Sequence, residues 1–384
     1  MKKKVLLITS YVLVSALSVA MTLGLVYWQT GGVSKLEQLE EIIEKCYIGE
    51  ADPVILEDAA ADAMVAATGD RWSYYIPASE YAAYRENAEN AYVGIGITIT
   101  VAHDGSGLQI MEVNPGSSAE EAGLRVDDVI TAIEGQSTGD MTTTEARNLV
   151  RGEEGTPVEL TLWRQGETLT VSVMRRKVEV AVATGQLLEG NVGLVSIVNF
   201  DERCSGETIA AIEALLQQGA EKLIFDVRNN PGGYADELVK LLDYLLPEGD
   251  LFRTVDFKGN ENVDVSDAAC LTIPMAVLVN GESYSAAEFF AVALQEYEAA
   301  VVVGEKTSGK GHFQSTFRLS DGSAVALSIG KYYTPRGISL EGVGIVPDVE
   351  VPVDQETAME IYYGQMEPEN DPQIQAALEA LGNE

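Results

Sequence analysis

Histidine, cysteine and basic residues are all scarce in this chain of 384 residues. Only His103 and His312 are available to chemistry that needs an imidazole. The three cysteines are an odd number without metal-ligand spacing, so neither a disulfide framework nor a zinc site follows from them. Lysine and arginine total 25 against 60 acidic residues, and the formal net charge of −35 argues against nucleic acid as a partner. Nothing in the sequence implies a metal or an organic cofactor.

The N-terminus combines three lysines with a long uncharged stretch. After MKKK, residues 5–28 carry no charge, and 24 residues at ~1.5 Å each can cross a bilayer core of roughly 30 Å. Lysines before the span and none within it place the N-terminus in the cytoplasm. A cleaved signal peptide, with a small-residue site at 18–20, is the alternative, although its apolar core is usually only ~7–15 residues long. We therefore expect a single-pass membrane anchor at residues 1–30 and an extracytoplasmic remainder.

Residues 31–90 have the pattern of a packed helical segment. Apolar residues recur at helical spacing within 33–48 and again within 54–67, with charged residues between them. Residues 69–89 continue into a loop and another short helix.

From residue 91 to 177 the hydrophobic period changes from helical spacing to two, and glycine-rich turns separate short strands. Gly94 and Gly96, beside Ile95 and Ile97, let consecutive backbone N–H groups point toward one carboxylate, while the following strand pairs with a bound peptide. The alternative is that these glycines only permit a tight entry into the strand. The segments YVGIGI and NPGSSAEEAGLRVDDVITAIEGQ resemble a PDZ domain, which implies a peptide-binding module.

Strands and helices alternate between residues 178 and 352, a pattern that predicts βαβ units and a largely parallel sheet. We expect residues 317–335 to form an antiparallel hairpin that closes this sheet. The acidic tail at 353–384 is predicted to be partly helical, and no chemistry is evident in it.

Ser285 opens the sequence Ser-Ala-Ala-Glu at a predicted helix start. One interpretation is a simple N-cap, in which the serine oxygen accepts a backbone N–H. The other is a nucleophile, because a helix N-terminus offers free N–H groups and positive potential to a developing oxyanion.

A serine nucleophile needs a base, and two residues compete for that role. Lys310 lies between two glycines, and burial there would lower its pKa from ~10.4 toward the ~7–8 that suits a general base. His312 is the rival, because residues 310, 312 and 314 share one face of an extended strand. An exposed lysine in a glycine turn is the structural alternative.

Residues 304–310 also match the G-x-x-x-x-G-K spacing of a phosphate-binding loop. However, Gly311 stands where a magnesium-binding serine or threonine is required, and the next residues alternate as a strand instead of opening a helix. Nucleotide binding is therefore disfavoured.

Four segments together resemble the serine–lysine carboxyl-terminal processing peptidases of family S41, which carry a PDZ domain. They are NGESYSAAE, GEKTSGKGHFQ, DVRNNPGG and YYTPRGISLEGVGIVPD, and the resemblance spans roughly residues 40–350. It implies a mixed α/β (α+β) architecture: a crotonase/ClpP-like protease core with an inserted PDZ domain. One departure is Ala287, where a second serine is common.

The resemblance also assigns roles to residues. Ser285 would be the nucleophile, Lys310 the general base and Gln314 the residue that orients the lysine. The oxyanion hole would be formed by the amide of Ala286 and one from the turn that contains Gly232 and Gly233.

The function implied is a membrane-anchored extracytoplasmic serine endopeptidase that cleaves proteins near their C-termini. Its PDZ domain would bind substrate or regulator C-termini and gate the enzyme, with Arg151 as the candidate contact to the catalytic domain. A homodimer through the terminal helical segments is implied by the family alone. The alternative is a non-catalytic peptide-binding or scaffold protein on the same fold.

Overall fold

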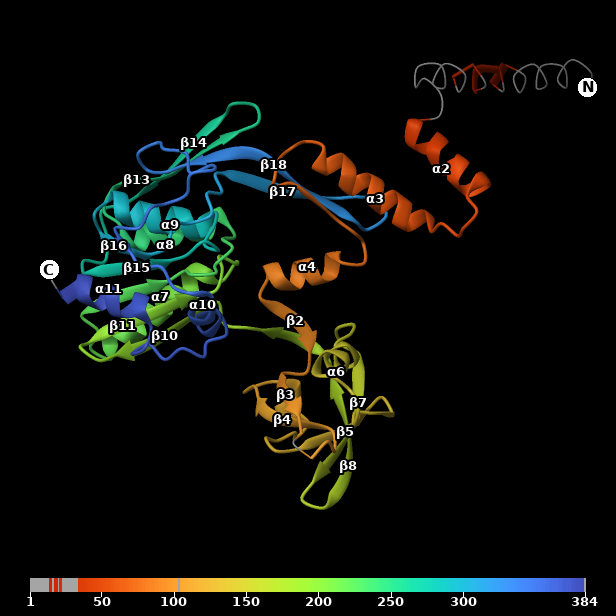
Figure 1. Cartoon of the computed structure of the whole chain (residues 1–384), viewed down its shortest axis with the longest axis horizontal. Coiled ribbons are helices and arrows are strands. Elements are labelled where there is room, and N and C mark those ends of the chain that lie inside the picture. Colours follow the sequence, from red (N-terminus) through yellow and green to blue (C-terminus); the bar gives the residue numbers. More distant parts are fainter. Residues whose placement is uncertain (1–13, 16, 20, 23–33, 103, 383–384) are drawn as a thin grey trace, which may run out of the picture.

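The computed structural model describes residues 14–15, 17–19, 21–22, 34–102 and 104–382 (Figure 1). Most of the predicted anchor, residues 5–28, lies outside these ranges. Within the described part of the chain, no helix has both the length and the apolar character that a membrane span needs.

Two helices follow the N-terminal stretch, α2 (Lys35–Cys46) and α3 (Pro53–Ala66). Ser34 and Glu37 form a capping box on α2, and Asp52 caps α3, which explains where both begin. Neither helix buries a residue. The hydroxyl of Tyr75 donates to Asp58 on α3 at 2.7 Å, so α3 contacts the segment that follows it. A packed helical segment stays a prediction for these two helices.

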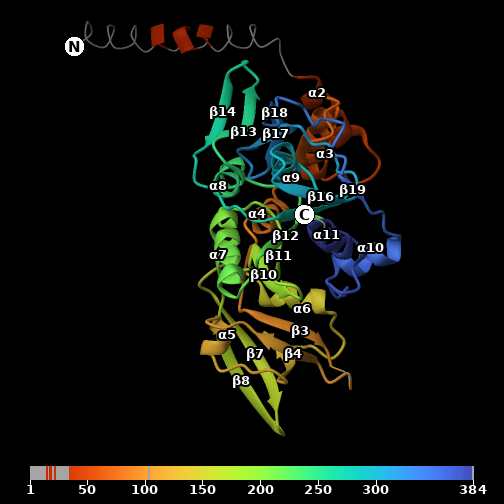
Figure 2. The ribbon, with the colours of Figure 1, turned by 90° about the vertical axis from the view of Figure 1, so that its left-hand side faces the viewer.

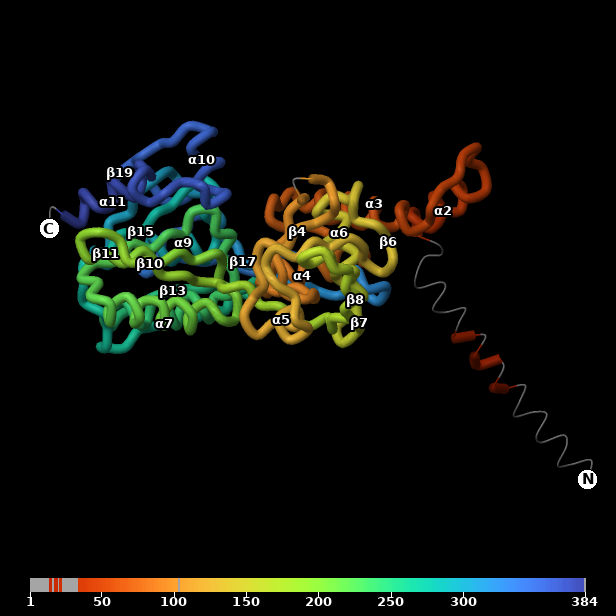
Figure 3. The backbone as a smooth tube through the Cα atoms, turned by 90° about the horizontal axis from the view of Figure 1, so that it is seen from below, coloured from red at the N-terminus to blue at the C-terminus, as the bar shows by residue number. Residues whose placement is uncertain are grey.

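The N-terminal segment then joins the body of the molecule through β1 (Tyr74–Ile76), α4 (Tyr81–Ala88) and β2 (Ala91–Gly94). β1 pairs with a strand of the core, and β2 pairs with β9 (Arg176–Glu179), so that a two-stranded ribbon leads into and out of the inserted module. Figures 1 and 3 show this module beside the core, and Figure 1 shows α4 between the two.

The inserted module is a six-stranded antiparallel sheet with two short helices, as the period-two pattern predicts. Its strands are β3 (Ile97–Val101), β4 (Leu108–Val113), β5 (Val129–Ile133), β6 (Gln136–Ser137), β7 (Pro157–Arg164) and β8 (Glu167–Met174), and its helices are α5 (Ser118–Glu121) and α6 (Thr143–Val150). Fully buried side chains such as Leu108, Ile130 and Leu160 form a core of its own.

The core contains the predicted parallel sheet, in the order β10-β11-β12-β15-β16-β19, with only β10 antiparallel to its neighbour. These strands are β10 (Ala183–Leu188), β11 (Val192–Ile197), β12 (Lys222–Asp226), β15 (Met275–Val279), β16 (Ala300–Gly304) and β19 (Val349–Glu350). All five residues of β15 are buried, as a strand covered on both faces requires.

Helices cover both faces of this sheet (Figure 2). Leu223 and Phe225 point toward α7 (Cys204–Gln217), α8 (Ala235–Leu245) and α9 (Ala286–Glu296). Ile224, between them, points to the opposite face, where α11 (Pro372–Gly382) packs. The C-terminal tail also holds α10 (Gln355–Tyr362), and its Asp371 forms a buried ion pair of 2.8 Å with Arg228.

A second, antiparallel sheet corrects the predicted hairpin. β17 (His312–Arg318) and β18 (Ala324–Tyr333) do pair, but they join β1, β13 (Gly249–Asp256) and β14 (Glu261–Ser266) instead of closing the parallel sheet. β13 and β14 were not predicted, because residues 249–266 are rich in Asp, Asn, Glu and Gly, which are depleted in strands. β13 is a strand through its pairing with β18, and β14 through its pairing with β13. The mixed α/β class is confirmed.

Candidate active site

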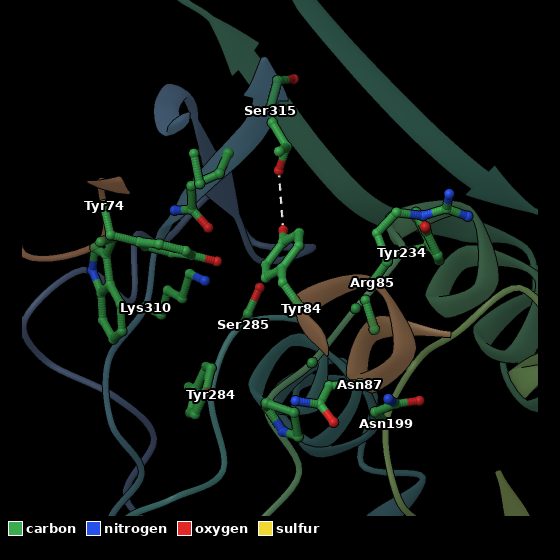
Figure 4. Close-up of a pocket in the computed structure, with 18 of the residues that line it drawn as sticks. Tyr74, Tyr84, Arg85, Asn87, Asn199, Tyr234, Tyr284, Ser285, Lys310 and Ser315 are labelled. Atoms are coloured by element: carbon green, nitrogen blue, oxygen red, sulfur yellow. Dashed lines mark hydrogen bonds between the residues drawn. The ribbon is translucent and has the colours of Figure 1, made fainter. Parts of the chain in front are cut away.

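A cavity of about 870 Å³ lies among the C-terminal ends of the parallel strands, α4 and the second sheet. Its walls bring together residues that are far apart in the sequence and that were expected to act together: Gly232, Gly233, Ser285, Lys310 and Gln314. Tyrosines supply much of the remaining surface, including Tyr74, Tyr84, Tyr234 and Tyr284 (Figure 4).

Ser285 stands between β15 and α9 in an unusual backbone conformation. Its φ is 58° and its ψ is −126°, in a region that residues other than glycine rarely adopt. Ser285 is the N-cap residue of α9 and forms a capping box with Glu288, so the expected cap is present. A simple N-cap has an extended backbone, so capping alone does not account for this conformation. Ser285 is 6% exposed, and Figure 4 shows its hydroxyl pointing into the cavity near Lys310 and Tyr84.

Glu288, in the first turn of α9, holds Ser285 and the loop that contains Lys310 together. This fully buried carboxylate accepts hydrogen bonds from the amide of Ser285 at 3.0 Å, from the amides of Gly309 and Lys310 at 2.8 Å each, and from the hydroxyl of Thr307. Four donors therefore occupy its two oxygens. The sequence indicated Glu288 only as part of a helix cap; its position three residues after Ser285 was the one available signal.

The amine of Lys310 lies over two aromatic rings that stack on each other, with their centroids 6.0 Å apart. Its Nζ is 5.1 Å from the ring centroid of Trp72 and 5.5 Å from that of Tyr284. Burial lowers the pKa of Lys310 to about 8, although the nearby carboxylates of Asp70, Glu288 and Glu341 oppose this shift. The exposed-lysine alternative is therefore wrong. No hydrogen bond joins the Lys310 amine to the Ser285 hydroxyl, both of which the structure describes.

Trp72 reaches this site from the N-terminal segment, and nothing in the sequence singled it out. Its indole Nε1 donates to Glu341 at 3.1 Å, and its backbone amide donates to Asp70 at 3.1 Å. One carboxylate thus holds the ring and another holds the backbone. The segment before β1 thus supplies one wall around the lysine.

Gln314 and His312 differ from the expected alternation along β17. β17 begins only at His312, so Lys310 is not part of the strand, and the extra residue of a β-bulge, Ile329, lies on β18 opposite the step from Phe313 to Gln314. Gln314 lines the cavity and His312 does not. The amide of Gln314 donates to the carbonyl of His312 at 3.2 Å and to the hydroxyl of Ser328 at 3.3 Å. The structure thus separates His312 from Ser285, and Gln314 makes no hydrogen bond to Lys310.

The glycine turn after β12 packs directly against Ser285 and Ala286. Gly232 has a φ of +85°, and a Cβ there would lie 2.8 Å from the backbone nitrogen of Ala286. The amide of Gly232 donates to the side chain of Asn230 at 2.8 Å. Gly232 is thus needed for close approach, and the amides of Gly233 and Ala286 remain as candidates to stabilise an oxyanion.

The inserted module has a groove of about 280 Å³ between β3 and α6, lined by Gly94, Ile95, Gly96 and Ile97 as expected. Gly96 has a φ of +81°, and a Cβ there would meet Ser117 at 2.4 Å.

Arg151 lies at one end of this groove, and its contact differs from the expected one. Its guanidinium pairs with Glu86 on α4 at 3.0 Å, and not with a residue of the catalytic core, because α4 intervenes. The hydroxyl of Tyr84, on the same helix, lies 3.0 Å from that of Thr316 in the cavity wall.

Comparison with known proteins agrees with this geometry. Residues 191–351 match the model of peptidase family S41, and residues 109–164 match that of the PDZ domain. The chain is 31% identical to a probable CtpA-like serine protease of Staphylococcus saprophyticus, over 90% of this chain and 72% of that protein. This chain belongs to peptidase family S41 and contains a PDZ domain.

Other S41 proteins extend the comparison. A probable CtpA-like serine protease of Staphylococcus aureus (strain COL) is 34% identical over 85% of this chain, and this chain spans 66% of its length. A putative S41 protease from Bacteroides fragilis has a similar fold, with a TM-score of 0.51 at 18% identity, over 90% of this chain and 97% of that one.

The Glu288 network predicts a stability effect. In the S41 core, Glu288→Gln replaces an accepting oxygen with an NH2 group that faces N–H donors, and we expect the free energy of unfolding to fall by about 2–5 kcal/mol. Urea denaturation followed by circular dichroism measures it. The matched control is Glu282→Gln, at an exposed position on the preceding loop, which should change stability by less than about 0.5 kcal/mol. Equal stabilities of the two variants would contradict the role of Glu288.

Proposed function

We propose that this protein is a membrane-anchored serine endopeptidase that cleaves proteins near their C-termini through an acyl-enzyme intermediate. The observation that carries the proposal is the convergence of Ser285 and Lys310 on one cavity, with the serine in a strained turn at a helix start and the lysine desolvated. The relatives described as probable CtpA-like serine proteases support the same activity.

In the proposed reaction, the neutral amine of Lys310 accepts the proton of the Ser285 hydroxyl as the oxygen attacks the peptide carbonyl. The oxyanion is stabilised by the amides of Gly233 and Ala286, the latter at the N-terminus of α9. The Lys310 ammonium then protonates the leaving amine, and water repeats the cycle on the acyl-enzyme. Gln314 orients the amine in this scheme. Substrate binding brings Lys310 within hydrogen-bond distance of Ser285, because catalytic hydrogen bonds often tighten only in the complex.

The catalytic pair gives the first test. The full chain in detergent is incubated with an unstructured protein, and we expect Ser285→Ala and Lys310→Ala each to lower kcat by about 10³-fold or more. Lys306→Ala, at an exposed lysine of the same loop, is the matched control and should keep full activity. Cleavage that survives either catalytic substitution would refute the mechanism. Absence of cleavage by the parent would instead favour the peptide-binding or scaffold alternative.

The pH dependence gives a second test. Since only the neutral amine can act as base, kcat/KM should rise with pH through a midpoint near the pKa of Lys310, about 8. Trp72→Ala admits water, which favours the charged form, so the midpoint should move upward toward the ordinary lysine value of 10.5. Trp72→Leu keeps an apolar wall and should move it less. A midpoint near ~6.5 that does not respond to Trp72 would point to a histidine base.

Control by the PDZ domain is the regulatory part of the proposal. A peptide in the groove contacts the end where Arg151 lies, and Arg151 is paired with Glu86 on α4, whose other residues line the catalytic cavity. In this proposal the short helix α4 joins the PDZ groove to the catalytic cavity, and binding at either site shifts it.

This coupling predicts that Arg151→Ala and Glu86→Gln change the ratio of peptide-stimulated to basal cleavage in the same direction. The double variant should be no worse than the stronger single one, because both remove the same ion pair. Rates of cleavage with and without an added C-terminal peptide measure the ratio. If Arg151→Ala leaves both rates unchanged, the regulatory role is withdrawn.

Location and assembly remain proposals from the sequence. The lysines before the uncharged residues 5–28 support an anchor with the catalytic domain outside the cytoplasm. On α2, Leu36, Leu39 and Ile42 are 44, 52 and 59% exposed, and a homodimer through the terminal helical segments would cover them.

A further inference from the structure

The PDZ groove carries one charged side chain that has no partner. Three residues of α6 line the groove, Thr143, Arg147 and Val150, at the spacing of one helical face. Arg147 is exposed, and among the described residues none forms an ion pair or a side-chain hydrogen bond with its guanidinium. Its helical neighbours three and four residues away are Thr143, Thr144, Val150 and Arg151, none of them acidic.

The orientation of α6 fixes which end of the groove receives a carboxylate. The guanidinium of Arg175 donates to the carbonyls of Leu149 and Val150, at the C-terminal end of α6. The next residue, Arg176, pairs with Gly94. The C-terminal end of α6 therefore lies beside the turn 94–97, whose amides would hold a peptide carboxylate, and Thr143 lies at the far end.

The spacing of these residues along α6 can be compared with the spacing of side chains along a bound peptide. The last residue of a bound peptide would face Val150, Ile95 and Ile97, which form an apolar surface. In an extended peptide the side chain two residues earlier points the same way, about 7 Å further on. Along α6, Arg147 is about 4.5 Å and Thr143 about 10.5 Å from Val150. That earlier side chain therefore lies between the two, within reach of the long arginine.

We propose that the groove selects C-termini that end in an aliphatic residue and carry Asp or Glu two residues before it, with Arg147 binding that carboxylate. This selectivity rests on the proposed binding of C-termini by the PDZ domain and adds the chemistry of the ligand.

Charge supports an acidic ligand at this one place. The chain has a net charge of −35, so its overall field disfavours acidic peptides at long range. At physiological salt, however, screening acts over about 8 Å. Arg147 and Arg151 are the charged residues that line the groove, and Arg151 is already paired with Glu86, so a ligand there meets the charge of Arg147. Arginine binds carboxylates through two parallel N–H groups, which adds geometric selectivity.

The test uses the full chain with Ser285→Ala, so that peptides are bound and not cleaved. Fluorescence anisotropy compares three labelled peptides that end in valine and differ only two residues before it, in Glu, Gln or Lys. We expect Glu to bind about two- to fivefold more tightly than Gln, as for an exposed ion pair, and Lys to bind most weakly. The difference should shrink in 1 M NaCl.

Substitutions locate the effect. Arg147→Gln should abolish the preference for Glu, and Arg147→Glu should reverse it toward Lys. The matched control, Arg125→Gln, removes an exposed arginine of the same module outside the groove and should leave the preference intact. Equal binding of the Glu and Gln peptides, or a preference that survives Arg147→Gln, would overturn the selectivity alone. If no peptide binds, or a C-terminal amide binds as well as the free acid, the proposed capture of C-termini fails as well.

Discussion

The arrangement of the candidate active site depends on the buried carboxylate of Glu288. Ser285 begins a helix after β15, whereas Lys310 follows β16 on a glycine-flanked loop, and no covalent constraint aligns them. Oε2 of Glu288 accepts hydrogen bonds from the amides of Ser285 and Lys310, and Oε1 accepts from the amide of Gly309 and the hydroxyl of Thr307. A buried charge must be satisfied in this way or it destabilises the fold. The hydrogen bonds that satisfy Glu288 therefore also hold the backbones of Ser285 and Lys310 close together.

Around this centre, the environment of Lys310 is assembled from distant parts of the chain. Trp72 comes from the N-terminal segment, Tyr284 from the turn after β15, and Glu341 from the loop after β18. Aromatic walls exclude water from the amine, and the three nearby carboxylates limit how far its pKa falls. Since Trp72 lies only nine residues before α4, the segment that contacts Lys310 is continuous with the helix that contacts the PDZ domain.

Local patterns in the sequence predicted the elements well, and their assembly less well. The strands of the PDZ domain, the alternation of the core, and the positions of Ser285, Lys310 and the glycine turn all have short-range signals in turn residues and periodicity. The second sheet did not, because β14 is polar and is a strand only through its partner. Trp72 could not be found either: its role comes from a contact with Lys310, 238 residues away. The bulge at Ile329 of β18, opposite Phe313 and Gln314, is likewise a property of the pairing between the two strands.

The distribution of positive charge follows from the acidic composition. With 60 carboxylates for 25 basic residues, an arginine readily finds an acidic partner, and many do. Those in ion pairs are Arg85, Arg151, Arg164, Arg176, Arg203, Arg228 and Arg253. A cation that is kept apart from carboxylates in such a chain therefore needs a structural cause. For Lys310 the cause is the aromatic enclosure, which favours a neutral amine; for Arg147 it is a helix face without acidic neighbours, which leaves the guanidinium directed at a groove. A bound peptide would therefore meet two unpaired basic side chains in this acidic protein. Lys310 is suited to accept a proton, and Arg147 is suited to bind a carboxylate.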